Sequence, residues 1–175
     1  MARASQALET VRADPRRVAE LAALANDEDP LVCQRALDLL EKLAREQPEW
    51  IRPHKRLFIG PLADSDRWEV RLQIVRALPL FRWTPAQRRR AVAILRRDVL
   101  HPQKFVRAWA LDSLAAFAQA DPKLRPAVLR HLDAFERSGS KALMARARHI
   151  RERLSTSSDR QEARRSRARR PDSSS

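Results

Sequence analysis

The stretch DSDRWEVRLQIVRAL at residues 64–78 decides the fold, because its pattern recurs along the chain. An acidic turn comes first, and Val70, Ile74 and Leu78 then follow at helical spacing, on one stripe of a helix. Similar apolar runs begin at Val32, Val70, Val106 and Leu143, at spacings of 38, 36 and 37 residues. A period of this size is typical of stacked supersecondary units, so the sequence predicts a repeat array.

Proline provides a second marker of the same period. Pro48, Pro85 and Pro122 stand 37 residues apart, and each opens an apolar pattern of helical spacing. Proline is well tolerated in the first turn of a helix, so each repeat is expected to hold a first helix, a polar turn and a second helix. Glycine is scarce, with 2 residues, and no stretch alternates as a strand does, so the fold is expected to be all-α.

Other prolines fall where they should bend helices. Pro53 and Pro126 lie early in their first helices, and Pro15 has the same distance to its second-helix marker. Pro79 interrupts the second helix of its repeat, where it removes a backbone hydrogen bond. We expect these bends to curve each repeat around its neighbour.

The repeat pattern predicts one domain followed by a tail. Residues 155–175 contain six Arg and three acidic residues and no apolar side chain larger than Ala, so we expect this tail to be disordered. The predicted domain covers residues 1–154, with repeats at about 5–46, 47–83, 84–120 and 121–154.

Three stretches resemble HEAT repeats, in which an acidic turn precedes Val-Arg and then Ala and Leu at helical spacing. They are DEDPLVCQRALDLL at 27–40, DSDRWEVRLQIVRAL at 64–78 and FVRAWALDSL at 105–114. The chain is also similar to small bacterial HEAT-repeat proteins of unassigned role. The resemblance implies a right-handed α-α superhelix, or solenoid, of about four helix pairs that acts as an interaction scaffold without catalytic residues.

The same resemblance implies a structural ladder between adjacent repeats. Arg71 and Arg107 match the family's Arg, and Asp27 and Asp64 match its turn acid. Cys33 and Met144 replace the Arg in the outer repeats, so the ladder is expected to be interrupted there.

Residue types that support catalysis are dispersed along the sequence. The four His lie in three repeats without metal-ligand spacing, and the two Gly form no phosphate-binding loop. We therefore expect no enzyme activity, no cofactor and no metal. A minor alternative is a DNA glycosylase of the HEAT-like type, because Trp109 and Asp112 stand three residues apart on one helix.

The cysteine content and the hydropathy of the sequence indicate the cellular compartment. The single Cys33 excludes an intramolecular disulfide, and its apolar setting predicts a buried thiol. The first residues lack the apolar core of a signal peptide, and no apolar run approaches about 18 residues. We expect a cytoplasmic protein with no membrane role.

The leading hypothesis for function is a scaffold that binds another macromolecule, expected to be a protein, on its concave second-helix face. Trp and Arg are favoured at interfaces, so the candidate partner-binding residues are those of the two middle repeats on that face. They are Trp68, Arg71, Arg76, Arg107 and Trp109.

The alternative hypothesis is nucleic-acid or polyanion binding. The formal net charge is +14, and the Arg-rich surface and tail present guanidinium groups suited to phosphate. The sequence leaves the identity of the partner and the oligomeric state open.

Overall fold

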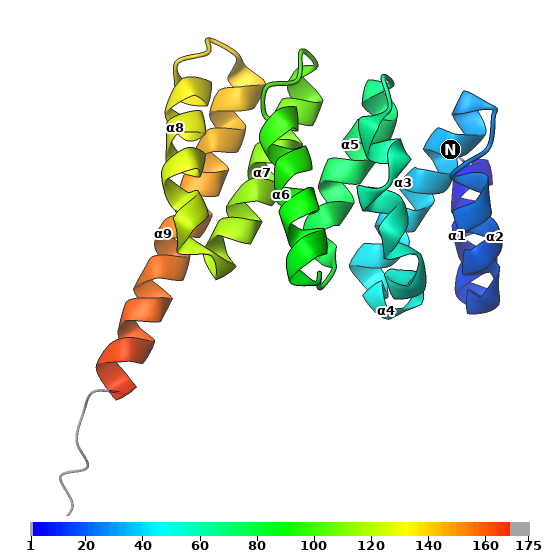
Figure 1. Cartoon of the computed structure of the whole chain (residues 1–175), viewed down its shortest axis with the longest axis horizontal. Coiled ribbons are helices and arrows are strands. Elements are labelled where there is room, and N and C mark those ends of the chain that lie inside the picture. Colours follow the sequence, from blue (N-terminus) through cyan, green and yellow to red (C-terminus); the bar gives the residue numbers. More distant parts are fainter. Residues whose placement is uncertain (1, 169–175) are drawn as a thin grey trace, which may run out of the picture. The chain divides into compact units, whose positions relative to one another are not determined.

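The computed structural model describes residues 2–168 of the chain, and it describes the burial of side chains from 6 to 156. Every regular element among the described residues is helical, which confirms the all-α prediction. The helices are shown in Figure 1. The α-helices are α1 (Ala2–Ala13), α2 (Val18–Leu24), α3 (Pro30–Glu46), α4 (Pro48–Ile51), α5 (Trp68–Ala77), α6 (Pro85–Asp98), α7 (Lys104–Ala120), α8 (Arg125–Glu136) and α9 (Lys141–Ala168).

Short 3-10 helices join or extend these elements. They are η1 (Pro15–Arg17), η2 (Arg52–Ile59), η3 (Pro61–Asp64), η4 (Leu78–Leu80) and η5 (Pro122–Leu124). The periodic prolines all open helices, because Pro48 begins α4, Pro85 begins α6 and Pro122 begins η5. Pro79 lies in η4, just past the end of α5 at Ala77, as expected for a residue that cannot continue the hydrogen-bond ladder.

The first helix of the second repeat is not only bent at Pro53 but mostly replaced by a 3-10 helix. Only Pro48–Ile51 is α-helical, and Arg52–Ile59 is a 3-10 helix. Pro53 removes one backbone donor near the start of this segment, so the α-helical pattern does not extend through it. The buried Phe58 still anchors the segment to the core.

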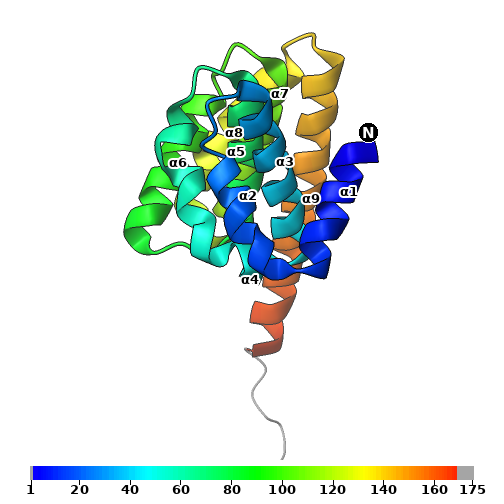
Figure 2. The ribbon, with the colours of Figure 1, turned by 90° about the vertical axis from the view of Figure 1, so that its right-hand side faces the viewer.

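The chain divides into two compact parts, Met1–Leu114 and Ala115–Ser175, and the boundary falls within α7. In the N-terminal part, α3 and α5 lie side by side, and η2 packs on α6. Seen along this part (Figure 2), α3, α5 and α7 follow one another while α6 lies to one side of them. The second helices therefore form one layer, and η2 and α6 lie in the other.

Apolar stripes of the second helices supply most of the core of the N-terminal part. Val70, Ile74 and Val106 are buried, and Val32 is half-buried beside the buried Cys33. In the C-terminal part, α8 packs on α9, with Val128 and Leu132 buried on α8 and Leu143 and Ile150 buried on α9.

Helix α9 extends beyond the predicted end of the domain. It continues to Ala168 and so includes the first residues of the expected tail, whose disorder stays a prediction. Arg, Ala, Glu and Gln favour helix, and a helix already formed is extended more easily than a new one is nucleated. The last residues of the predicted tail, 169–175, lie outside the described part of the chain.

Candidate functional site

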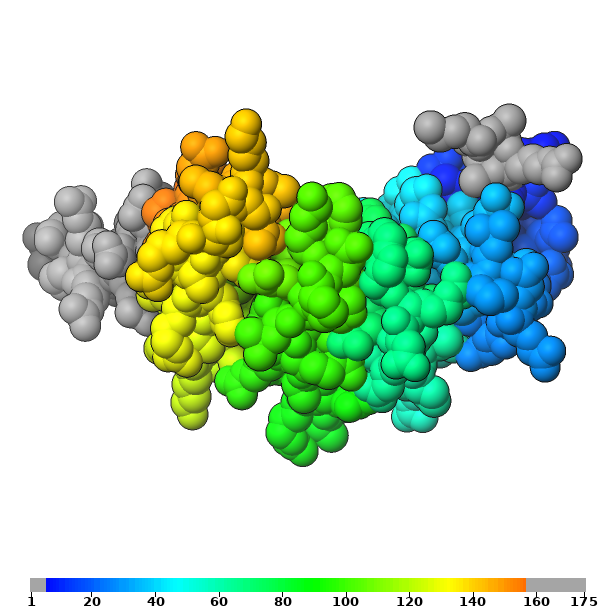
Figure 3. Space-filling view, turned by 90° about the horizontal axis from the view of Figure 1, so that it is seen from above, coloured from blue at the N-terminus to red at the C-terminus, as the bar shows by residue number. Residues whose placement is uncertain are grey.

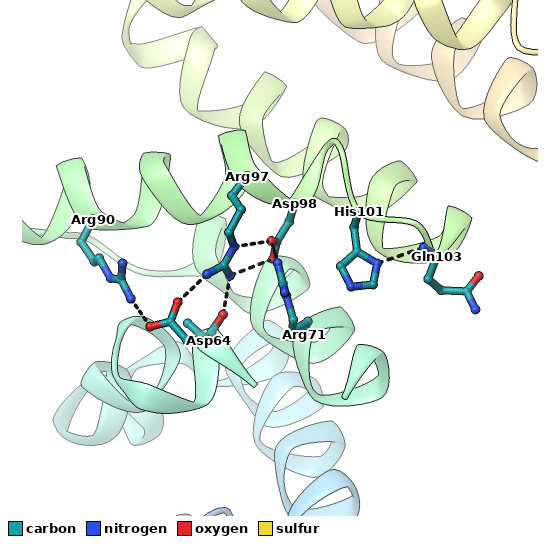
Figure 4. Close-up of polar contacts among 8 residues, drawn as sticks. Asp64, Arg71, Arg90, Arg97, Asp98, His101 and Gln103 are labelled. Atoms are coloured by element: carbon teal, nitrogen blue, oxygen red, sulfur yellow. Dashed lines mark hydrogen bonds and ion pairs between the residues drawn. The ribbon is translucent and has the colours of Figure 1, made fainter. Parts of the chain in front are cut away.

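A buried carboxylate holds the predicted ladder arginine. Asp98, the last residue of α6, is completely buried, and Arg71 of α5 donates from Nε to its Oδ2 over 3.3 Å and from Nη2 to its Oδ1. Arg97 also donates from Nε to Asp98 Oδ1 over 2.8 Å (Figure 4). Two guanidinium groups thus compensate one buried charge, and they join α5 to the end of α6.

The turn acid matched to the family ladder has other partners. Asp64 accepts hydrogen bonds from Arg90 and Arg97 of α6, and Arg97 also donates to the carbonyl oxygen of Ala63 (Figure 4). The hydrogen bond from Arg97 is the main cause that holds the pKa of Asp64 below its usual value. Burial acts in the opposite direction, and the hydrogen bond from Arg90 lowers this pKa further. Arg71 is therefore paired with Asp98 rather than with a turn acid matched by the resemblance, while the matched acid Asp64 binds arginines of the following first helix.

His101 follows this cluster in the turn before α7. Its Nδ1 accepts the backbone N–H of Gln103 over 3.0 Å (Figure 4). Burial lowers the pKa of His101, and the positive charges of Arg71 and Arg97 act in the same direction. These contacts favour a neutral imidazole that orders the turn. Within residues whose placement is described, no group of three His, Cys, Asp or Glu side chains could hold a metal ion.

A second cluster crosses the layer of second helices. Glu41 of α3 is completely buried and pairs with Arg45 one turn later on the same helix. Arg76 Nη2 of α5 lies 3.0 Å from Glu41 Oε2, without the geometry of a hydrogen bond, and Arg76 Nη1 donates to Gln73 over 3.2 Å. The charge of Glu41 is thus compensated by Arg45 of the same helix and by Arg76 of the next repeat.

The two arginines of this cluster also reach Trp109 of α7. The guanidinium carbon of Arg76 lies 5.2 Å from the ring centroid, and that of Arg45 lies 5.8 Å from it. These distances are typical of cation–π contacts. Side chains of α3, α5 and α7, which come from three successive repeats, therefore meet at this half-buried ring.

Two further rings extend the site along α7. The ring centroids of Trp68 and Phe105 are 6.3 Å apart, and Lys104 Nζ lies 5.4 Å from the Phe105 centroid. Phe105 and Trp109 stand four residues apart on α7, so they share one side of the helix. We call Trp68, Phe105 and Trp109 the aromatic strip. Phe105 is 47% exposed, which makes it the most open ring of the three.

The five predicted partner-binding residues fall into different surroundings. Trp68 and Trp109 belong to the aromatic strip, and Arg76 lies over Trp109. Arg71 is engaged by Asp98, and Arg107 is half-buried next to Val106.

Sequence reasoning missed Phe105, Arg45 and Glu41. Phe105 carried a usable signal, since it precedes the Val106 marker and stands one turn before Trp109. Glu41 carried none, because a Glu within a helical pattern is normally exposed.

Cys33 is buried, as predicted, and its thiol donates to the carbonyl oxygen of Ala25 over 3.1 Å. Burial raises the pKa of this thiol, against a smaller opposite effect of Arg67. Cys33 is therefore a packing residue with low nucleophilicity.

Comparison with known proteins supports the fold and leaves the family unnamed. No family model matches the chain, and no curated protein matches it. Among solved structures, the chain is similar to a designed armadillo repeat protein in complex with the peptide (KR)4, with 17% identity and a TM-score of 0.59. The match covers 77% of this chain and 62% of the designed protein, so the chain spans less than two thirds of that protein's length.

The chain is thus a helical-repeat solenoid in fold, which confirms the resemblance to helical repeat proteins. At this level of identity the similarity concerns the fold alone. In the described residues, no helix combines the length and the hydropathy that crossing a membrane requires.

Proposed function

We propose that the chain is a non-enzymatic scaffold that binds another protein on the side of its second helices. The observation that carries this proposal is the aromatic strip, in which Trp109 of α7 lies within reach of arginines from α3 and α5, and Trp68 of α5 contacts Phe105 of α7. Trp and Arg are enriched among the residues that dominate binding energy at interfaces. Contacts within the strip pre-order these side chains, so less conformational entropy is lost when a partner binds.

The charges around the strip indicate the chemistry of the partner. Glu41 is buried beneath Arg45 and Arg76, while the Arg45 side chain is 41% exposed and Lys104 is exposed near Phe105. The charged groups that contact the rings of the aromatic strip are therefore cations. They complement a segment that carries Asp or Glu beside apolar side chains.

The designed armadillo repeat protein supports a peptide-like partner, because its structure holds the peptide (KR)4. That peptide consists of Lys and Arg, whereas the charged groups that contact the rings of the aromatic strip are themselves positive. For this chain we therefore propose a partner of the opposite charge.

The proposal divides the five predicted residues by role. Trp68, Arg76 and Trp109 contact the partner, together with Phe105 and Arg45. Arg71 acts through the stacking of repeats, since its guanidinium is held by the buried Asp98.

The minor alternative of a DNA glycosylase rests on Trp109 and Asp112 sharing an open groove. Asp112 is buried, and Trp109 is in contact with two arginines. The proposal therefore assigns both residues to packing and binding rather than to chemistry.

Selection from a random displayed peptide library against the full-length protein tests the proposal. We expect the selected peptides to combine acidic and apolar residues. Phe105→Ser removes the most exposed ring of the strip, so it should weaken binding of these peptides about tenfold, which corresponds to about 1.4 kcal/mol. Arg45→Glu should weaken binding of the same peptides by reversing an accessible charge.

The matched control is Leu100→Ser. Leu100 is 73% exposed and lies outside the strip, so this variant loses an apolar side chain and should bind as the wild type does. Peptides whose affinity is the same for the wild type, Phe105→Ser and Arg45→Glu would show that binding lies elsewhere and would overturn the proposed face.

A further inference from the structure

The positive charge of the N-terminal part is distributed unevenly between its two layers of helices. The segments 49–64 and 81–98, which contain η2 and α6, carry nine basic and three acidic residues. The second helices α3, α5 and α7 together carry seven basic and five acidic residues. The excess of positive charge therefore belongs to the first-helix layer, which the proposed protein-binding strip does not occupy.

Helix α6 presents four of its five arginines in two rows. Arg89 and Arg96 form one row and Arg90 and Arg97 the other, and all four side chains are exposed. Members of a row are seven residues apart, which is about 10.5 Å along a helix. Ala93 lies between the rows and leaves the guanidinium groups unobstructed.

The two rows differ in their partners. Arg90 and Arg97 both pair with Asp64, which neutralises part of their charge. Arg89 and Arg96 contact no acidic side chain in the part of the chain that the structure describes. One row is thus held in place by the protein, and the other points to solvent with its full charge.

Segments next to α6 extend this surface. Arg90 Nε approaches the carbonyl oxygen of Ile59 over 3.5 Å, which ties the end of η2 to α6. Arg56 of η2 and Arg82 before α6 are exposed, and neither side chain has an acidic contact among the described residues. We call Arg56, Arg82, Arg89 and Arg96 the basic face. In Figure 3 the green segment that contains α6 forms the lower edge of the N-terminal part, open to solvent.

A depression of about 460 Å³ opens beside the basic face. Arg52, Lys55 and Arg82 supply three of its lining side chains, and Glu49, the one acid among the described lining residues, lies 3.0 Å from Arg52 Nη1 through its Oε2. Phe81 and Leu80 form an apolar wall of the depression. Cations grouped around a low-dielectric hollow focus the electric field, so this depression increases attraction for anions.

We propose that the basic face binds the phosphate backbone of double-stranded DNA. Arginine offers a planar fork that matches phosphate oxygens, and a DNA duplex presents one negative charge per about 1.7 Å of its axis. Arg89 and Arg96, about 10.5 Å apart along α6, therefore each meet a phosphate of the backbone. This binding goes beyond the proposed protein-binding function and uses different residues.

The structure favours a duplex over a single strand. Single strands are held by stacking their bases on exposed rings. The aromatic residues next to the basic face are occupied, since Trp83 Nε1 donates to the Leu78 carbonyl oxygen over 2.8 Å and its ring packs edge-on against Phe81. Lys55 also lies over the Trp83 ring, with Nζ 5.3 Å from the centroid. The face therefore offers charge without a stacking surface.

Fluorescence anisotropy with a labelled DNA duplex, measured over a range of salt concentrations, tests the proposal with the full-length protein. The logarithm of the association constant should fall linearly with the logarithm of salt concentration, with a slope of about −0.9 for each phosphate contacted. Arg89→Gln/Arg96→Gln removes two contacts. Its slope should be shallower by about 1.8, and its affinity at low salt should fall at least about tenfold.

The matched control is Arg35→Gln/Arg130→Gln, which removes the same total charge from exposed arginines on α3 and α8. Its slope should equal that of the wild type. Weaker binding of an unpaired single strand of the same length would further support a duplex site.

Three results would overturn the proposal. The first is equal slopes for Arg89→Gln/Arg96→Gln and its control. The second is loss of binding when Arg164, Arg165 and Arg167 become Gln while Arg89→Gln/Arg96→Gln binds normally, which would assign binding to the C-terminal segment. The third is tighter binding to the single strand than to the duplex. None of these results bears on the peptide-binding strip, so failure here leaves the proposed function standing.

Discussion

At the scale of single residues, two buried carboxylates determine how the arginines of the N-terminal part are used. Asp98 and Glu41 are both completely buried, and each draws guanidinium groups from a neighbouring helix. A buried charge without a partner is strongly unfavourable, so these acids fix the side chains of Arg71 and Arg76. Arg71, which looks available in the sequence, is thus a structural residue, whereas Arg76 is held in place over Trp109.

Asp98→Asn should be strongly destabilising. It leaves Arg71, whose side chain is only 14% exposed, beside a neutral amide, and breaking a buried ion pair in this way typically costs about 3 kcal/mol. The measurement is urea denaturation followed by circular dichroism.

The comparison variant for Asp98→Asn is Asp64→Asn. Asp64 is 50% exposed and also binds two arginines, so its loss should reduce the free energy of unfolding by less than about 1 kcal/mol. Similar losses for the two variants would show that burial does not set the strength of these pairs.

The sequence predicted the chemistry of these residues better than their partners. Arg71 was matched to a structural ladder by resemblance, but its partner Asp98 lies 27 residues away at the end of α6. That pairing depends on how α6 is placed against α5, and no local pattern carries this information. The aromatic pair of Trp68 and Phe105 was missed for the same reason, because the two rings come from different helices.

At the scale of elements, the start of α6 shows how sequence signals become structure. The Thr84 hydroxyl oxygen accepts the backbone N–H of Gln87 over 3.3 Å, and the Gln87 side chain accepts the backbone N–H of Thr84 over 3.2 Å. This capping box satisfies two donors at the helix start, and Pro85 needs none. The beginning of this helix could therefore be predicted from three residues.

Thr84→Ala should lower the free energy of unfolding by about 1 kcal/mol, because the first turn of α6 loses its side-chain acceptor. Thr84→Ser keeps a hydroxyl at the same position and should stay close to the wild type. Denaturation midpoints of the two variants, compared at equal slope, provide the measurement. Equal midpoints for Thr84→Ala and Thr84→Ser would mean that the cap contributes nothing measurable.

Other elements were less predictable. Pro53 indicated a bend in the first helix of the second repeat, but not the replacement of most of that helix by η2. At the far end of the chain, the sequence did not indicate that α9 continues to Ala168. In both places the local sequence permits more than one backbone, and helix propensity alone does not decide between them.

At the scale of the whole molecule, the repeat period was sufficient to predict the class of fold. Spacings of 36 to 38 residues between equivalent apolar positions have few structural explanations besides stacked helix pairs. The partner could not be predicted. The stacking of repeats requires only that their apolar stripes match, whereas binding of a partner depends on the side chains that stay exposed on the surface.

Stability should be local in a chain built from such repeats. Ile150→Val in α9 removes one buried methylene, for about 1 kcal/mol, so amide hydrogen exchange in α8 and α9 should accelerate about fivefold. Exchange in α3 should remain unchanged. Ile74→Val in α5, at an equally buried position, should give the reverse pattern. Uniform acceleration throughout the chain in either variant would indicate a single cooperative unit.

The pairing of Glu41 with Arg45 and Arg76 has a consequence for how the molecule meets its surroundings. By drawing guanidinium groups inward on one layer, the buried acid leaves the opposite layer as the more electropositive pole of the N-terminal part. The electric field of a polyanion orients such an asymmetrically charged protein during association, so that α6 faces the polyanion at first contact. The rings on the far layer would then remain accessible, and the protein could tether a second molecule to the first.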